Sequence, residues 1–247
     1  MIIYPDIEIQ DGKCVNLVRG DMGNPRVYDV DPIQAARDFA AQGAEALHVI
    51  DLDGVAQGGR HNAELICEIF EAVDVPVQVG GGIRTFESAL WWFDHGADRI
   101  VVGSAGVTDR RMLEKCCGRF AGKVIVSVDV RGGNVMIDGW RATTAFEPVE
   151  LIGQLADLGV AEIIFTDIDR DDDLPDATFA LTTQVATDAG IPLISSGCVK
   201  TLDDVATLRY LPNIAGTVIG RALFGGVFTL PEALDVADQP MTKAALQ

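Results

Sequence analysis

Long apolar stretches are missing from this chain. No apolar run reaches 18 residues, so no membrane-spanning helix is expected. The first residues, Met1–Pro5, also lack the basic region and the apolar stretch of a secretory signal peptide. Because 48% of the residues are hydrophobic, a disordered chain is excluded as well. These features predict a cytoplasmic globular protein.

Basic residues are scarce. Lys and Arg number 19 against 37 Asp and Glu, which gives a formal net charge of −18 at pH 7. Nucleic-acid binding needs Lys and Arg to neutralise phosphates, so nucleic acid is excluded as a partner. We expect a small-molecule ligand and a monomeric protein. If the ligand is anionic, the negative net charge of the protein repels it. Its pocket must then be locally basic or rich in backbone N–H groups.

Metal-binding spacings are absent too. The five cysteines form neither a Cys-x-x-Cys pair nor a Cys/His pattern typical of zinc sites. Reduced structural thiols are the favoured interpretation. The acidic run Asp171–Asp173 could hold a metal ion, but a solvated turn is favoured. We therefore predict a protein without a metal site.

Eight short runs rich in Val and Ile alternate with amphipathic stretches. The runs cover roughly residues 2–9, 46–51, 76–80, 99–103, 123–129, 162–167, 192–196 and 216–220. They are mostly apolar on both faces, which is typical of buried parallel strands. The stretches between them, such as Pro32–Gln42 and Leu202–Tyr210, have helical periodicity. This alternation predicts a closed (β/α)8 TIM barrel rather than an open sheet, with residues 1–247 as one domain.

An internal repeat supports the barrel. Residues 43–53 align with residues 159–169, an offset of 116 positions. At the same offset Gly81 aligns with Gly197, and residues 83–85 align with residues 199–201. The repeat predicts two similar half-barrels, so a ligand group bound by one half can have a counterpart in the other.

Glycine-rich segments follow four of the predicted strands. They form two pairs, Gly80–Gly82 with Gly103–Ser104, and Ser196–Gly197 with Gly220–Arg221. In such barrels the active site lies at the carboxyl ends of the strands. Glycine lets backbone N–H groups approach a phosphate closely, and a following helix N-terminus adds a favourable dipole. One such loop can be a tight turn only, but two pairs related by the repeat predict two phosphate subsites.

Two carboxylates end strands that face each other across the predicted barrel. Glu8 ends the first strand and Asp129 ends the fifth. Carboxyl groups on opposite sides of a bound ligand suit general acid–base catalysis. The alternatives are a helix N-cap and a salt bridge with Arg131.

Two further residues keep alternatives open. His48 lies within the second predicted strand, where it is either a core histidine or a hydrogen-bonding partner of the substrate. Trp140 follows Gly139 after the fifth strand, where it either stacks on a planar ring or covers the barrel mouth.

Along nearly its whole length the chain resembles the ribotide isomerases of histidine biosynthesis. The matching segments are Asp11–Lys13, Gly20–Asp21, His48–Gly54, Val79–Arg84, Val102–Ser104, Asp129–Arg131, Gly139–Trp140, Thr166–Ile168 and Ile219–Leu223. The sister cyclases of imidazole glycerol phosphate synthesis share the half-barrel repeat but end their first strand with Cys-Leu-Asp, which is absent here. The resemblance implies an Amadori rearrangement of phosphoribosylformimino-aminoimidazole-carboxamide ribotide to its ribulosyl isomer, without a metal or organic cofactor.

The resemblance also implies residue roles. Glu8 stands where the family has its aspartate base, Asp129 matches the acid that protonates the ribose ring oxygen, and Thr166 matches a catalytic threonine. The residues expected to bind substrate or its phosphates are Arg19, His48, Gly81, Gly82, Arg84, Gly103, Ser104, Trp140, Asp171, Gly197, Gly220 and Arg221.

Five positions depart from the family pattern. Glu8 moves the base carboxylate by about one methylene, and a shift of about 1 Å can cost about 100-fold in rate. Asn16 stands where the family has a substrate-binding arginine, which Arg19 could replace. The other three are Asp172 and Cys198, expected near the second phosphate subsite, and Thr178. Two interpretations follow: a working isomerase, or a diverged paralogue that acts on another phosphorylated sugar or binds a phosphorylated ligand without turnover. In both, the first subsite is expected to bind phosphate first.

Overall fold

A computed structural model of the chain describes residues 1–18, 20–171 and 178–239. Eight parallel strands form a closed ring at its centre. They are β1 (Ile2–Gln10), β4 (Leu47–Asp51), β5 (Val77–Gly80), β6 (Arg99–Val102), β7 (Val124–Arg131), β10 (Glu162–Asp167), β11 (Leu193–Ser196) and β12 (Ile214–Ile219). Pairing of β1 with β12 and of β7 with β10 closes the ring. The predicted (β/α)8 barrel is therefore confirmed.

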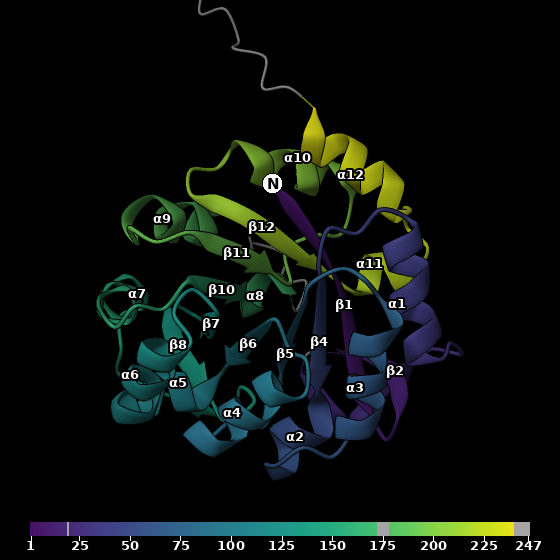
Figure 1. Ribbon diagram of the computed structural model, residues 1–247. Helices are drawn as coiled ribbons and strands as arrows, with labels where there is room; N and C mark the ends of the chain where they lie inside the picture. The colour runs from purple at the N-terminus through teal and green to yellow at the C-terminus, as the bar shows by residue number, and fades with distance from the viewer. Residues whose placement is uncertain (19, 172–177, 240–247) are drawn as a thin grey trace, which may run out of the picture.

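Helices surround the strands (Figure 1). They are α1 (Pro32–Ala41), α2 (Leu52–Gln57), α3 (Ala63–Ala72), α4 (Phe86–Asp94), α5 (Ser104–Thr108), α6 (Arg110–Arg119), α7 (Pro148–Asp157), α8 (Ile168–Asp171), α9 (Ala180–Asp188), α10 (Leu202–Tyr210), α11 (Arg221–Phe224) and α12 (Leu230–Asp238). Throughout the described ranges, no helix is both long and apolar enough to cross a membrane.

Two antiparallel extensions lengthen the strands that were predicted to end at Glu8 and Asp129. β2 (Lys13–Val18) folds back on β1 and pairs with β3 (Asp21–Val27). β8 (Asn134–Ile137) folds back on β7 and pairs with β9 (Ala142–Thr143). Because these hairpins continue the sheet past the barrel rim, β1 and β7 run two residues beyond the predicted ends, to Gln10 and Arg131.

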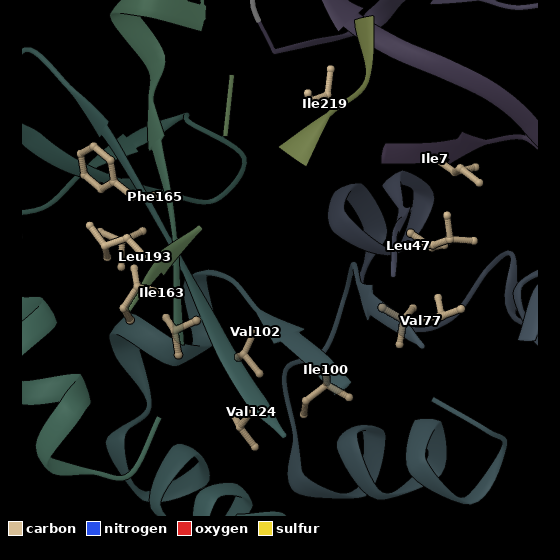
Figure 2. Packing of buried hydrophobic residues seen from close by; sticks show 14 of the residues in the cluster. Ile7, Leu47, Val77, Ile100, Val102, Val124, Ile163, Phe165, Leu193 and Ile219 are labelled. Atoms are coloured by element: carbon tan, nitrogen blue, oxygen red, sulfur yellow. The ribbon is translucent and has the colours of Figure 1, made fainter. Parts of the chain in front are cut away.

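Alternation along each strand divides the core in two. Figure 2 shows side chains such as Ile7, Leu47, Ile163 and Phe165, which belong to the large apolar cluster that also contains residues of the surrounding helices. A smaller cluster is built from Tyr4, Val101, Ile125, Ile164, Ile194 and Val218. Along each strand these residues alternate with those of the large cluster, so their side chains point to the opposite face of the sheet, into the barrel. They fill the barrel interior beneath the carboxyl ends of the strands. Inward-pointing residues near the carboxyl ends of the strands can therefore line an active site.

The predicted repeat has a structural counterpart. At the 116-residue offset β5 coincides with β11 and α4 with α10, from first residue to last. Thr85 caps α4 by accepting from the Ser88 N–H, and Thr201 caps α10 by accepting from the Asp204 N–H. Equal caps at equal positions give each half the same strand–loop–helix geometry.

Candidate active site

A cavity of about 330 Å³ opens at the carboxyl ends of the barrel strands. The proposed catalytic residues Glu8, Asp129 and Thr166 line it together. Of the predicted binding residues, it is lined by His48, Gly81, Gly82, Arg84, Gly103, Ser104, Trp140, Asp171, Gly197, Gly220 and Arg221. Arg19, the remaining predicted binding residue, lies outside the described residues.

Asp129 points into the cavity from β7, with the inward parity of Ile125 and Ser127. Its Oδ1 accepts a hydrogen bond from Ser127 Oγ at 2.8 Å, and its Oδ2 accepts one from the Trp140 indole Nε1 at 2.9 Å. Burial raises the pKa of Asp129, and hydrogen bonds from Trp140, Ser127 and Thr166 lower it in part. Such a carboxyl group can hold a proton while its donors are ready to stabilise the anion left behind.

Thr166 lies next to Asp129 because β10 pairs with β7 in a register that sets the two residues opposite each other. The same strand pairs Thr166 with Ser196 of β11 on its other side. Thr166 is buried and lines the cavity. Strand register alone therefore brings together an acid and a hydroxyl that are 37 residues apart.

Glu8 occupies the corresponding place on β1, across the barrel from β7. Its Oε2 accepts hydrogen bonds from Asn16 Nδ2 at 2.9 Å and from the Leu17 backbone N–H at 3.3 Å. Burial raises the pKa of Glu8, whereas these two donors lower it. Glu8 lies inside a strand, so the N-cap alternative is wrong for this residue.

Asp6 is a site residue that the sequence analysis missed. It precedes Glu8 by two positions, shares its inward parity and lines the same cavity. Burial raises the pKa of Asp6 well above its usual value, and the nearby Glu8 and Asp171 carboxylates raise it further, against Arg221. The period-2 alternation of β1 could have identified it, since any residue two places before an inward side chain also points inward.

The first predicted phosphate subsite joins the ends of β5 and β6. Gly81 and Gly82 both have positive φ. A Cβ on Gly81 would meet Asp51 O at 2.2 Å, and one on Gly82 would meet Gly59 O at 2.4 Å. Close backbone packing therefore requires both glycines, whether or not a phosphate binds.

Gly103 differs from Gly81 and Gly82. A Cβ on Gly103 would meet none of the described residues within 4 Å, so they leave the space beside it open. Ser104 begins α5, and its Oγ accepts from the Asp138 N–H at 2.8 Å. Arg84 lies nearby in the lining, and its guanidinium donates to Val55 O at 3.0 Å.

The second predicted subsite is arranged differently. Arg221, the first residue of α11, donates to Asp171 Oδ1 at 2.5 Å and to Asp171 O at 2.9 Å. A Cβ on Gly197 would lie 2.7 Å from Asp171 Oδ1, and one on Gly220 would lie 3.1 Å from Asp6 Oδ2. The carboxyl groups of Asp171 and Asp6 therefore lie directly beside Gly197 and Gly220, respectively.

His48 and Trp140 both line the cavity. His48 is 5% exposed, its Nδ1 lies 2.9 Å from Gln78 Nε2, and burial lowers its pKa to about 3. It is thus a neutral imidazole, which can hydrogen-bond a ligand without adding charge. Trp140 has a positive φ and donates to Asp129, a role that neither sequence alternative included.

Two departures from the family pattern lie outside the cavity lining. The Cys198 side chain is 0% exposed and packs in the large apolar cluster, and burial raises the pKa of its thiol to about 12. The Cys198 side chain therefore packs in the core, away from the cavity, although the neighbouring Gly197 lines the cavity. Thr178 is exposed and its Oγ1 accepts from the Ala180 N–H, while Asp172 lies outside the described residues.

Asp51, a polar strand end of the matching segment His48–Gly54, has a structural role. Its Oδ1 accepts from the Gly54 N–H at 3.0 Å, which caps α2, and from Asn62 Nδ2 at 2.7 Å. Its Oδ2 accepts from the His61 N–H at 2.8 Å. These bonds tie Asp51 to the segment from Gly54 to Asn62, and Asp51 does not line the cavity, so its side chain stabilises this loop.

Comparison with known proteins agrees with the geometry. The family model described as "Histidine biosynthesis protein" matches residues 2–229. A protein of Ruegeria pomeroyi named 1-(5-phosphoribosyl)-5-((5-phosphoribosylamino)methylideneamino) imidazole-4-carboxamide isomerase 2 is 42% identical over 96% of both chains. Isomerases of the same substrate name from Moorella thermoacetica and Halobacterium salinarum are each 41% identical, over 96% and 94% of this chain and 98% and 95% of theirs. The chain therefore belongs to the histidine biosynthesis protein family.

Proposed function

We propose that this chain is an aldose–ketose isomerase that carries out the Amadori rearrangement of the phosphoribosyl aminoaldose in its relatives' names, hereafter the ribotide. The observation that carries the proposal is the placement of Asp129 and Glu8 on opposite walls of one cavity. The relatives' names favour this activity over a diverged paralogue. Both carboxyl groups are buried, which suits groups that must exchange protons with a substrate.

Asp129 acts first, as the acid. Burial keeps its carboxyl group protonated to higher pH than an exposed aspartate. The proton passes to the ribose ring oxygen, the C1–O bond breaks, and the nitrogen lone pair forms a Schiff base with C1. The carboxylate that remains accepts hydrogen bonds from Ser127 and Trp140, so the charge formed in the step is stabilised where it arises.

Glu8 acts next, as the base. It removes the C2 proton, and the electron pair moves to form an enol-amine. The Asn16 amide and the Leu17 N–H hold its Oε2 in place and favour the ionised form that a base needs. Protonation at C1 and loss of the C2 hydroxyl proton then give the ketose, which leaves no net change in protons.

The phosphate of the aminoaldose provides the anchor for these steps. The open space beside Gly103, bounded by Ser104 and Gly82, is the place that we assign to it. Backbone N–H groups can bind a phosphate there without a lysine, which fits a chain with a net charge of −18. A fixed phosphate sets the distance from the sugar to both carboxyl groups.

The direct test is turnover of the ribotide by the purified chain, followed by conversion of aminoaldose to aminoketose. Asp129→Asn is expected to lower kcat by at least about 1000-fold, because an amide cannot supply the proton. Asp188→Asn, an exposed carboxylate at the end of α9, is the matched control and is expected to retain full activity. A wild-type chain that leaves the ribotide unchanged, or an Asp129→Asn variant with normal turnover, contradicts the proposal.

A further inference from the structure

The side chain of Asn16 connects the cavity wall to the proposed base. β2 folds back on β1 in a register that pairs Glu8 with Val15, so the next residue of β2, Asn16, lies within reach of the Glu8 carboxyl group. Its amide Nδ2 donates a hydrogen bond to Glu8 Oε2 at 2.9 Å. Gly220 leaves room for this amide, since a Cβ there would lie only 3.0 Å from Asn16 Nδ2. The amide therefore has a fixed place between Glu8 and the end of β12.

The oxygen of the same amide has no partner among the described residues. Asn16 lines the cavity although the residue is only 3% exposed. Its Oδ1 is buried, and none of the described residues donates a hydrogen bond to it. Buried acceptors normally have a partner, because an unpaired acceptor has given up its bonds to water without a replacement. A donor on a ligand in the cavity would supply that partner.

The place of this oxygen beside the base limits which donor can reach it. Both hydrogen bonds to Glu8 go to Oε2, and no described residue donates to Oε1. Oε1 is therefore the atom that can take the C2 proton. In an aminoaldose, C2 carries that hydrogen and one hydroxyl group. A substrate whose C2–H bond points at Glu8 therefore brings its C2 hydroxyl, the one donor bonded to the reacting carbon, close to Asn16.

We propose that Asn16 binds the C2 hydroxyl of the aminoaldose through Oδ1 while its Nδ2 holds Glu8, and that it thereby aims the C2–H bond at the base. This inference rests on the proposed isomerase function, because it assigns a role at the same site. Asn16 accepts a hydrogen bond and takes no proton, so the steps of the rearrangement are unchanged. The contact selects aminoaldoses with the ribose configuration at C2. In the opposite configuration the hydroxyl group, and not the hydrogen, faces Glu8.

Binding of two unreactive analogues of the ribotide tests the inference without turnover. In both, a CH2 group replaces the ring oxygen of the reacting ribose, so the ring cannot open. One analogue keeps the C2 hydroxyl and the other lacks it. We expect calorimetric titration to show that the wild type binds the analogue with the hydroxyl about tenfold more tightly, because without it Asn16 Oδ1 stays unpaired.

Variants of Asn16 separate its two bonds. Asn16→Ala is expected to bind both analogues with equal affinity. Asn16→Asp keeps an acceptor oxygen in the same place, so it should preserve the preference for the hydroxyl, although its added negative charge weakens binding of both phosphorylated analogues. Asn24→Ala, at an exposed asparagine of β3, is the control and should match the wild type.

The alternative is that Asn16 only holds Glu8, and that water or the Asp6 carboxyl group satisfies its Oδ1. Equal binding of both analogues by a wild type that turns over the ribotide would overturn the inference and leave the proposed function intact. A preference for the hydroxyl that persists in Asn16→Ala would overturn it as well. A wild type that neither turns over the ribotide nor binds either analogue contradicts both the inference and the proposed function.

Turnover of an epimer gives a second test. The ribotide with inverted configuration at C2 of the reacting ribose is expected to have a kcat/KM at least about 100-fold below that of the ribotide in the wild type. Asn16→Ala is expected to narrow this ratio at least about tenfold, whereas Asn24→Ala should leave it unchanged. A ratio that stays the same in Asn16→Ala means that other residues select the configuration, which overturns the inference.

Discussion

The indole Nε1 of Trp140 donates a hydrogen bond to Asp129 Oδ2 over 2.9 Å. Trp140 comes from the β8–β9 hairpin and Asp129 from a barrel strand, so this bond ties a loop to the proposed acid. Trp140 also covers Gly20, where a Cβ would lie only 2.5 Å from the indole ring. The glycine, the tryptophan and the aspartate therefore form one packed contact between the two hairpin loops and the barrel.

Trp140→Phe tests this contact. We expect kcat to fall about tenfold, because a hydrogen bond to the carboxylate formed in the acid step is lost. The Trp140 bond lowers the pKa of Asp129, so its removal should raise that pKa and move the basic limb of the pH–rate profile to higher pH. The measurement is kcat as a function of pH, with Trp91→Phe on α4 as control. An unshifted basic limb would show that the indole bond does not act on the acid.

Gly103→Ala tests the phosphate anchor. A Cβ on Gly103 would meet no described residue within 4 Å, but the backbone has φ −84° and ψ −120°, which alanine adopts less readily than glycine, so the variant should fold with a somewhat lower melting temperature. The methyl group would occupy space that we assign to the phosphate, so KM for the ribotide should rise about tenfold with a smaller change in kcat. Gly118→Ala in α6 is the control, because a Cβ there would also meet no described residue within 4 Å. Equal KM values in both variants would place the phosphate elsewhere.

Glu8→Asp tests the reach of the base. Glu8 Oε2 is held by Asn16 Nδ2 and the Leu17 N–H, so a side chain shorter by one methylene loses the bond to Asn16 or strains to keep it. We expect kcat to fall about tenfold or more, because small displacements of a catalytic group are costly. Glu8→Gln should remove activity, since an amide cannot take the C2 proton. A higher kcat for Glu8→Asp would contradict this expectation. It would mean that an aspartate at position 8 places the base better than Glu8 does, even without the hydrogen bond from Asn16.

Asp6→Asn is expected to stabilise the fold at neutral pH. Burial raises the pKa of Asp6 above its value in the unfolded chain. The Asp6 carboxyl group therefore binds its proton more tightly in the folded chain. The contribution of Asp6 therefore favours folding below the unfolded-state pKa and is lost as pH rises through the folded-state pKa. Asparagine carries no such charge, so the variant should melt at a higher temperature than the wild type at neutral pH.

Melting curves over a range of pH check this expectation. The difference in melting temperature between Asp6→Asn and wild type should widen as pH rises from about 4 to about 8. Asp188→Asn, at an exposed position, should show no such trend. A difference in melting temperature that stays constant at all pH values would show that the charge on Asp6 does not destabilise the folded chain.

The sequence by itself determined the features that depend on hydrophobic periodicity and on the order of strands and helices along the chain. Alternating strand and helix patterns predicted the barrel, and the 116-residue repeat predicted halves that share the Thr85 and Thr201 caps. Strand order set Glu8 and Asp129 on opposite walls, because a closed ring of eight strands places the first across from the fifth. These features follow from local chain geometry, which one sequence contains in full.

Tertiary structure decided which side chains meet. Folding of the β8–β9 hairpin over the barrel mouth brings Trp140 to Asp129, and pairing of β1 with β12 brings Asp6 to Gly220. Packing turned Cys198 into the core and made Asp51 a cap, although both adjoin residues that line the cavity. Such outcomes depend on contacts between segments far apart in the chain. Neighbours in sequence share a strand, but only strand register and loop packing decide which atoms share a cavity.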